Sequence, residues 1–339
     1  MSRTELESTA RAMAAPEKGL LAADESAGTI QKRFDGVKVE CTEETRRTWR
    51  ELLFATPGIE QFISGVILFD ETLRQKAKDG TPFPKFLSDR GILPGIKVDK
   101  GAMSLAGFPG EKVTEGLDGL RERFTEYRGL GARFSKWRAV ITIGARIPTP
   151  GCIEANAHAL ARYAALAQEG GLVPIVEPEV LMDGDHDLAR CEEVTEATLR
   201  STFAALRQQN VLLEGMVLKP NMVVSGKACP KQAGVEEVAR ATLRCLRRTV
   251  PAAVPGVAFL SGGQSPEAAS AHLSAMNALG DLPWQLTFSY SRALQDPVLK
   301  TWKGQASSAA AAQRVFQHRA RCNSAARQGR YSKEMEAAA

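Results

Sequence analysis

The sequence predicts a (β/α)8 barrel, in which eight parallel strands form a closed barrel (a TIM barrel) inside a ring of helices. Short apolar or β-branched runs recur eight times, about 30 to 45 residues apart, and amphipathic, Ala-rich stretches separate them. Runs of this kind, which do not strictly alternate, are typical of parallel strands buried on both faces. No Gly/Pro/Ser-rich linker divides the chain, so we expect one domain over 1–339. A doubly wound sheet is the alternative.

The expected strands, in chain order, are 19–24, 62–70, 92–98, 139–144, 172–180, 211–219, 254–262 and 286–290. Helices are expected at 155–171, 192–210 and 235–250, the last two with acids early and basic residues late, as the helix dipole favours. Ser265 and Pro266 open a further helix as N-cap and first helical residue. A C-terminal helix and a mobile tail are expected at about 307–339.

The composition is that of a globular protein. Hydrophobic residues are 44% and charged residues 24%, which excludes a disordered chain, a collagen and a disulfide scaffold for the bulk of the sequence. Lys and Arg number 44 against 39 Asp and Glu, a net charge of +5. That excess is compatible with nucleic acid, anionic lipid or phosphorylated metabolites as partners.

The sequence shows no pattern typical of a signal peptide or a membrane helix. The N-terminus has no apolar core of the signal-peptide type, and no run approaches the ~18 apolar residues of a membrane helix. The six cysteines are scattered without a CxxC pair, which favours reduced thiols in the cytoplasm. No two of the four histidines stand four residues apart, so we expect no catalytic metal and no cofactor.

Charged residues stand at several expected strand ends, where a barrel of this kind carries its function. Lys219 closes a long apolar run, and burial or a neighbouring cation would lower its pKa enough for it to attack a carbonyl. Glu177 and Glu179 point the same way on a strand, and each can raise the pKa of the other. Lys97 ends another run. Each alone is equally compatible with a solvated charge.

Other strand ends indicate anion binding. Lys136 and Arg138 flank Trp137 just before the run at 139–144. Small residues with Ser or Thr follow two strand ends, at 24–29 and 261–265, where backbone N–H groups can approach a phosphate. Arg292 would reach the second of these loops. One nucleophilic lysine, paired carboxylates and two anion sites together indicate imine chemistry on a substrate with a phosphate at each end.

From about residue 15 to 331 the chain resembles class I fructose-1,6-bisphosphate aldolases, the Schiff-base type. The matching segments are LLAADES (20–26), GIKVDKG (95–101), KWR (136–138), VPIVEPE (173–179), DGDHDL (183–188), LEGMVLKPNM (213–222), FLSGGQS (259–265) and LTFSYSRALQ (286–295). The set in this order is highly specific, although no single segment is.

The resemblance implies a cytoplasmic homotetramer that cleaves fructose 1,6-bisphosphate reversibly, without a metal, in glycolysis and gluconeogenesis. Lys219 would form the imine, Lys136 would favour its neutral form, Glu177 would be the acid/base of dehydration with Glu179 in support, and Asp24 would take the hydroxyl proton. Phosphate and site contacts are implied for Arg138, Ser261, Gly262, Ser291 and Arg292, and, at the other phosphate, for Ser26, Thr29 and Lys97.

Three departures from the family pattern stand out. Ser291 replaces a Gly and Thr29 replaces a Ser. The animal members also carry a longer tail that ends in a tyrosine which moves the proton at the dihydroxyacetone carbon, whereas this sequence stops at Ala339. Tyr331 aligns with an earlier tail position, so the resemblance assigns no group to that step.

Two alternatives compete with this interpretation. Another Schiff-base aldolase could act on a related sugar phosphate, although two anion sites favour a bisphosphate. A nucleic-acid-binding protein is the non-enzyme alternative, suggested by the net charge of +5 and the Arg-rich stretch 314–330. It would bind with a steep salt dependence, but the sequence lacks interleaved aromatic and basic RNA motifs.

Overall fold

The computed structural model describes residues 2–338; Met1 and Ala339, the two ends of the expected domain, lie outside the described residues. Eight parallel strands close into a barrel in the order β1-β10-β9-β8-β7-β6-β3-β2, which confirms the predicted fold class. These strands are β1 (Gly19–Ala23), β2 (Ile63–Leu68), β3 (Leu93–Lys97), β6 (Phe134–Ile141), β7 (Val173–Val180), β8 (Val217–Leu218), β9 (Gly256–Phe259) and β10 (Gln285–Tyr290).

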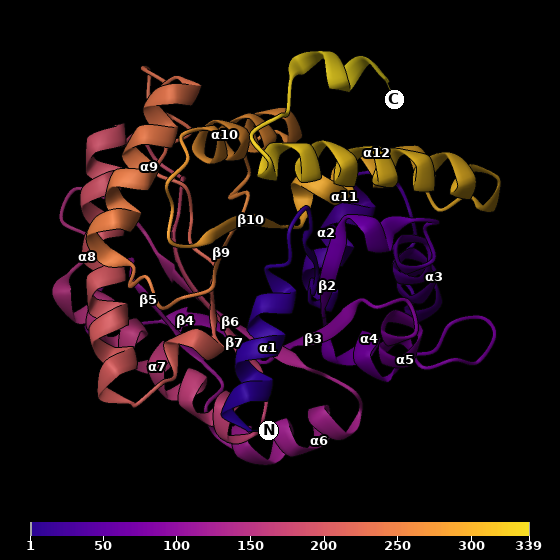
Figure 1. The fold of residues 1–339 in the computed structure, drawn as a ribbon, viewed down its shortest axis with the longest axis horizontal. Helices are drawn as coiled ribbons and strands as arrows, with labels where there is room; N and C mark the ends of the chain where they lie inside the picture. Colours follow the sequence, from indigo (N-terminus) through magenta and orange to yellow (C-terminus); the bar gives the residue numbers. More distant parts are fainter. Residues whose placement is uncertain (1, 339) are drawn as a thin grey trace.

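Helices surround the central strands (Figure 1). They are α1 (Arg3–Met13), α2 (Ala27–Asp35), α3 (Glu43–Phe54), α4 (Asp70–Arg74), α5 (Phe83–Ser88), α6 (Leu120–Gly129), α7 (Pro150–Glu169), α8 (Leu188–Gln208), α9 (Val235–Thr249), α10 (Pro266–Ala278), α11 (Arg292–Trp302) and α12 (Ala309–Arg327). Single 3-10 turns lie at Ile59–Gln61, Leu213–Gly215, Ala306–Ser308 and Lys333–Ala338. In the described chain no helix is both long and apolar enough to cross a membrane.

The helix starts follow the expected capping chemistry. Ser265 accepts a hydrogen bond from the backbone N–H of Ala268 at 3.1 Å, with Pro266 as the first residue of α10. The helix expected from residue 155 begins earlier, at Pro150, because Thr149 caps it through the N–H of Cys152.

Helix α1 closes the N-terminal end of the barrel, and it is drawn across the middle of Figure 1. Its buried residues Leu6, Ala10 and Met13 join the side chains of the barrel interior in one apolar cluster. The hydroxyl of Ser64 in β2 donates to the carbonyl of Met13 at 2.6 Å and fixes the helix there. The functional cavity is therefore confined to the opposite, C-terminal end of the strands.

Two features were not expected from the sequence. An antiparallel hairpin of β4 (Gly101–Ser104) and β5 (Lys112–Glu115) follows β3, outside the barrel. Strand β6 starts at Phe134, so residues 136–138 lie within the strand and not before it. The charged residues interrupt the apolar run, but they all point to one face, so the strand continues through them.

The last strands and helices also differ from expectation at their edges. Strand β8 is only Val217–Leu218, because residues 213–215 form a 3-10 turn where a strand was expected from 211. The C-terminal helix α12 lies along α10 and α11, as Figure 1 shows, and the turn at 333–338 follows it. The expected mobility of this tail stays a prediction.

Candidate active site

In four of the strands, the side chains that point into the barrel change from apolar to charged toward the C-terminal end. These inward rows are Leu20, Ala22 and Asp24 on β1 and its loop, Phe134, Lys136 and Arg138 on β6, Val173, Ile175, Glu177 and Glu179 on β7, and Val217 and Lys219 on β8. Because side chains alternate between the two faces of a strand, residues two apart share the interior. The apolar half fills the barrel, and the charged half forms a site above it.

This charged half lines a cavity of about 510 Å³. Every residue that the family resemblance assigns to the site lies on its wall: Asp24, Ser26, Thr29, Lys97, Lys136, Arg138, Glu177, Glu179, Lys219, Ser261, Gly262, Ser291 and Arg292. Its lining also holds Glu25, Lys32, Arg33, Asp99 and Ser289, which the sequence analysis did not select. The basic side chains number seven and the acidic five, so the wall carries a formal excess of two positive charges.

Four charges form a chain across the floor of the cavity. The Nζ of Lys219 lies 3.3 Å from Oε1 of Glu177, and the Nζ of Lys136 lies 3.2 Å from the other oxygen of Glu177. Lys136 also donates to Oδ2 of Asp24 at 2.6 Å. All four residues are buried, with at most 7% of their surface exposed. They meet because β6, β7 and β8 are neighbouring strands and β1 lies across the barrel.

The pKa values of the two lysines are shifted in opposite directions. Burial lowers the pKa of Lys219 below its usual value, and the positive charge of Lys136 lowers it further, against the opposing effect of Glu177. Burial also acts against the charge of Lys136, but Asp24 and Glu177 outweigh it and raise the pKa of Lys136. Lys136 therefore stays an ammonium, while Lys219 gives up its proton more easily than an ordinary lysine.

The carboxylates behave differently from the sequence expectation, which had Glu177 and Glu179 raise each other's pKa. Burial would raise the pKa of Glu177, but the charges of Lys136, Lys219 and Arg138 outweigh burial and lower it. Glu179 is occupied elsewhere, by an ion pair with the Nε of Arg138. For Glu177 the expectation was wrong, because cations are its nearest partners.

Trp137, which stands between the cations Lys136 and Arg138, does not line the cavity. Its ring points out of the barrel and stacks on Tyr163 of α7, with the ring centroids 5.5 Å apart. The two cations on either side of it point inward, as the alternation along β6 requires.

Lys97 and Asp99 form a second charged pair at the rim. The Nζ of Lys97 lies 2.7 Å from Oδ1 of Asp99, and Oδ2 of Asp99 accepts from the backbone N–H of Arg138 at 3.2 Å. Asp99 thus ties the end of β3 to β6. It stands two residues after Lys97, so the period of a strand would have placed it on the same face.

A glycine loop after β9 lies against two cations. Gly262 and Gly263 have left-handed backbones, with φ of +60° and +98°. A Cβ on Gly263 would lie 3.1 Å from the Nζ of Lys227 and 3.2 Å from the guanidinium nitrogens of Arg292, so no side chain fits there without moving them. Lys227 is paired with Asp183 at 2.8 Å. Backbone N–H groups and Arg292 thus converge where an anion can bind.

Glu25 organises a buried network beneath this loop. Its carboxylate is held by Arg33 at 2.5 Å and Arg50 at 2.7 Å, and it accepts from the hydroxyl of Ser291 at 2.5 Å and from Gln295 at 2.9 Å. Burial opposes ionisation, yet the two arginines bring the pKa of Glu25 down to about 2. The hydroxyl of Ser291 is therefore turned toward Glu25, which leaves the backbone of that residue to face the cavity.

Sequence reasoning missed part of this wall for two different reasons. Ser289 stands near the C-terminal end of β10, two residues before Ser291, which follows the strand directly, and its place near a strand end could have selected it. Arg33 and Arg50 come from α2 and α3, and no local pattern marks them. Only the closure of the barrel brings these helices against the β1 and β10 loops.

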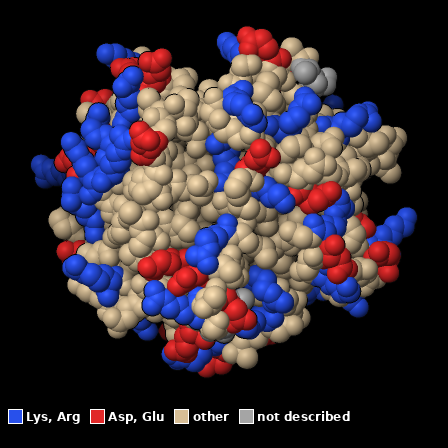
Figure 2. Space-filling view, viewed as in Figure 1, with Lys and Arg blue, Asp and Glu red and all other residues tan. Residues whose placement is uncertain are grey.

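Basic side chains also gather away from the cavity. Figure 2 shows Lys and Arg side chains over α8 and α9, at the left of the view, with Asp and Glu between them. Arg244 lies 2.5 Å from Glu192, and Arg200 and Arg248 lie 2.6 Å and 3.3 Å from Glu196. Many of the basic side chains outside the cavity are thus paired with carboxylates on the same helices.

A buried lysine with a lowered pKa, beside a carboxylate at the mouth of a (β/α)8 barrel, can attack a carbonyl carbon and form an imine. The carboxylate next to it can exchange the protons of that reaction. Fold and site together define the class of lysine-dependent enzymes that act on carbonyl compounds, here with cations placed for anionic groups.

Comparisons with known proteins agree with this class. The family model described as class-I fructose-bisphosphate aldolase, glycolytic, matches residues 5–339. A probable class 1 fructose-bisphosphate aldolase of Xanthomonas campestris is 62% identical over 98% of this chain and 99% of its own length. Fructose-bisphosphate aldolase 1 of Toxoplasma gondii is 56% identical over 96% of this chain and 91% of its own.

A solved structure of Plasmodium falciparum fructose-bisphosphate aldolase, in complex with TRAP and a small-molecule inhibitor, matches with a TM-score of 0.96 and 51% identity. The match covers 97% of this chain and 95% of that one. The chain belongs to the class I fructose-bisphosphate aldolase family. It is a metal-independent lyase of glycolysis and gluconeogenesis that reversibly cleaves fructose 1,6-bisphosphate to dihydroxyacetone phosphate and glyceraldehyde 3-phosphate.

Proposed function

We propose that Lys219 is the imine-forming residue of this aldolase and that Lys136, Glu177 and Asp24 run its proton transfers. The observation that carries this assignment is the contact of 3.3 Å between the Nζ of Lys219 and Glu177, in a buried site where Lys136 holds the other carboxylate oxygen. Moving one proton from Lys219 to Glu177 yields a neutral amine and a carboxylic acid. Those are the two species that the first steps require.

The neutral amine of Lys219 attacks the ketone carbon C2 and forms a carbinolamine. Glu177, now protonated, gives its proton to the C2 hydroxyl, which leaves as water, and the nitrogen lone pair forms the C=N bond. The product is a protonated imine. Lys136 remains an ammonium throughout, because Asp24 and Glu177 raise its pKa.

Asp24 accepts the proton of the C4 hydroxyl in the cleavage step. The O–H electrons form the aldehyde C=O, the C3–C4 bond breaks, and its electrons move into the protonated imine to give an enamine. Asp24 is available as a base because Lys136, despite burial, lowers its pKa and keeps it ionised. The enamine is then protonated at C3 and hydrolysed. No tyrosine lines the cavity among the described residues, and we assign no group to that protonation.

Two groups of residues would hold the phosphates. Ser261, Gly262, the backbone N–H of Ser291 and Arg292 surround the loop after β9 and would bind the phosphate on the ketone side. Ser26, Thr29 and Lys97 would bind the other phosphate, and Arg138 and Glu179 line the same cavity. Two such groups favour a bisphosphate over a monophosphate substrate. Fructose 1,6-bisphosphate is expected to be cleaved with a higher kcat/KM than fructose 1-phosphate.

Borohydride trapping tests the assignment of Lys219. The protein is reduced in the presence of dihydroxyacetone phosphate, digested and mapped by mass spectrometry. The label is expected on the peptide that contains Lys219, and Lys219→Ala is expected to lose both label and cleavage. Lys303→Ala, on the surface after α11, serves as the matched control. A label on another lysine, or full cleavage by Lys219→Ala, would refute the mechanism.

The assembly and location of the protein are further parts of the proposal. We propose a single domain, a homotetramer and a cytoplasmic location, with no nucleic-acid or membrane partner. Relatives named as cytosolic or cytoplasmic aldolases, at 55% identity, support the location. The mixed charges over α8 and α9 differ from a continuous basic surface. Analytical ultracentrifugation should give the mass of four chains, and salt-dependent binding to RNA would contradict the absence of that partner.

A further inference from the structure

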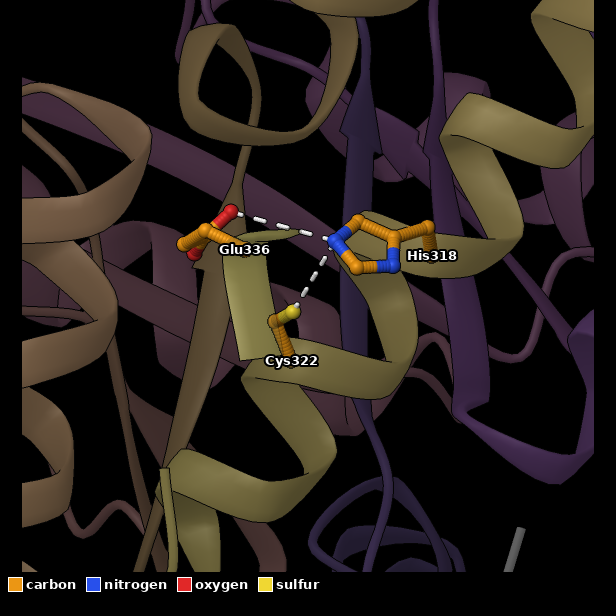
Figure 3. Close-up of side chains that lie close together, drawn as sticks. All are labelled: His318, Cys322 and Glu336. Carbon is orange, nitrogen blue, oxygen red and sulfur yellow. Dashed lines mark hydrogen bonds and ion pairs between the residues drawn. The ribbon is translucent and has the colours of Figure 1, made fainter. Parts of the chain in front are cut away.

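Three side chains with metal-binding atoms meet outside the aldolase cavity, at the C-terminal end of the chain. His318 and Cys322 stand four residues apart on one face of α12, and Glu336 approaches them from the 3-10 turn at 333–338 (Figure 3). The Sγ of Cys322 lies 3.5 Å from Nε2 of His318, and that nitrogen lies 3.8 Å from Oε2 of Glu336. None of the three lines the aldolase cavity.

We propose that these residues form a binding site for a divalent cation of the zinc type, which fastens the C-terminal turn to α12. Thiolate, imidazole and carboxylate are the ligands that Zn²⁺ takes in proteins, usually in a tetrahedron. With bonds of ~2.3 Å to sulfur and ~2.0–2.1 Å to nitrogen, tetrahedral angles put these two ligand atoms about 3.5 Å apart. The distance between the Sγ and Nε2 atoms is 3.5 Å.

The glutamate is the ligand that has to move. A tetrahedral ion would bring nitrogen and oxygen to about 3.3 Å, so Oε2 of Glu336 would move toward His318 from its distance of 3.8 Å. The other oxygen, Oε1, accepts from the hydroxyl of Tyr331 at 2.7 Å and from Arg319 at 2.5 Å. Arg319 also donates to Oε2 at 2.5 Å, and the ion would take the place of that hydrogen bond. These two donors orient the carboxylate, as outer partners of metal ligands usually do.

The charges around the site balance. A divalent cation, the thiolate of Cys322 and the carboxylate of Glu336 sum to zero, and the thiol proton of Cys322 leaves to the solvent as the ion binds. Arg321 lies 3.5 Å from Nδ1 of His318 and is exposed, so it can turn away when that nitrogen carries the proton. His318 also lines a separate surface cavity of about 480 Å³, next to Arg321 and Gln317.

The site has an entrance and a structural consequence. Cys322 is fully buried and His318 is 8% exposed, while the side chain of Glu336 is 22% exposed. An ion therefore enters from the side of the terminal turn, and its bond to Glu336 closes that turn over the site. Because the aldolase reaction is metal-independent, occupancy is expected to change the protection of residues 331–338 and to leave the cleavage chemistry unchanged.

Cobalt titration of the metal-free full-length protein tests the proposal, with Co²⁺ as the spectroscopic probe for Zn²⁺. One Co²⁺ per chain is expected to give a thiolate-to-cobalt charge-transfer band and the visible bands of tetrahedral cobalt, which Zn²⁺ then removes. Cys322→Ser should lose the charge-transfer band. Losing an outer partner of a metal ligand costs about 10- to 100-fold in affinity, so Glu336→Gln and His318→Gln should weaken binding at least that much.

Matched controls separate this site from the other buried thiols. Cys245→Ser, in α9, should keep the cobalt spectrum, and all variants should retain the circular dichroism and kcat of the unmodified chain. Zn²⁺ should also slow tryptic cleavage after Lys333 in the unmodified chain and not in Cys322→Ser. A spectrum without the charge-transfer band, or one that survives Cys322→Ser, would show that the three groups are only a hydrogen-bonded cluster.

Discussion

Replacing Lys136 by Met tests the electrostatic design of the site most directly. Met has no charge but keeps most of the length of the lysine side chain, so the substitution changes mainly the charge at this position. The substitution removes one positive charge from the neighbourhood of Lys219 and frees two carboxylates, those of Asp24 at 2.6 Å and Glu177 at 3.2 Å. Both effects stabilise the ammonium form of Lys219, so the pKa of Lys219 should rise.

The size of the rise follows from the number and distance of these charges. A single charge within ~4–6 Å shifts a pKa by about 1–3 units. Each unit reduces the neutral fraction of an amine about tenfold near neutral pH. Imine formation at pH 7 should therefore slow by about 10- to 1000-fold, and its pH dependence should move upward by about 1–3 units.

The assay is the initial rate of borohydride trapping of dihydroxyacetone phosphate as a function of pH. Lys136→Arg, which retains the charge, should show a smaller displacement than Lys136→Met. Removing a partner from a buried ion pair costs about 3–5 kcal/mol, so circular dichroism must show that Lys136→Met is folded. The double variant Asp24→Asn with Lys136→Met removes one unpaired carboxylate and serves if the single variant unfolds. A folded variant with an unchanged pH dependence would refute the reasoning.

Four further outcomes are expected. Arg292→Ala removes charge-assisted hydrogen bonds of about 1.5–3 kcal/mol and should raise KM about 10- to 100-fold. Lys227→Ala should change KM less, because Lys227 is already paired with Asp183. Equal effects of the two substitutions in steady-state kinetics would contradict this expectation. Glu177→Gln should lower kcat by about 10²- to 10⁴-fold, the usual contribution of a general acid, as measured by cleavage rates. The pKa of Glu25 is lowered to about 2, so the stability that its ionised form gives the fold is complete above about pH 5 and is lost as the pH falls toward 2. In Glu25→Gln, the free energy of unfolding, measured with urea, should therefore fall less steeply below pH 5. An unchanged pH dependence would exclude the network. Gly95→Ala should lower the free energy of unfolding by about 1–3 kcal/mol, because its Cβ would lie 2.2 Å from the ring of Phe134; an unchanged Tm would argue against this packing.

Much of the fold was predictable because the local signals agree with the tertiary structure. The buried runs that became β1, β2, β3, β7 and β10 were expected within a residue or two, since parallel strands covered by helices must be apolar on both faces. The ends of β6 and β8 were not predicted correctly from the sequence. Charged residues inside the barrel interrupt the apolar pattern of β6, and a 3-10 turn precedes β8.

The candidate site, too, could be predicted only in part from the sequence. Lys219, Glu177 and Asp24 could be selected from the sequence, because each stands at or near the C-terminal end of an expected strand. Lys136 could be selected because two cations flank Trp137 just before an expected strand. Their protonation states could not. The expectation of a raised pKa failed for Glu177, since a pKa depends on which charges lie within a few ångströms, and the cations around Glu177 come from neighbouring strands.

The sequence by itself determined the class of fold and the residues that could carry imine chemistry, since both depend on patterns within a few residues of one strand. The tertiary structure decided the rest. It turned Trp137 outward, bound Glu25 to arginines of two helices, and brought Glu336 to His318 and Cys322 across the C-terminal turn. The physical reason is that hydrogen bonds and charges act over a few ångströms, and only chain closure sets the distances between residues far apart in the sequence.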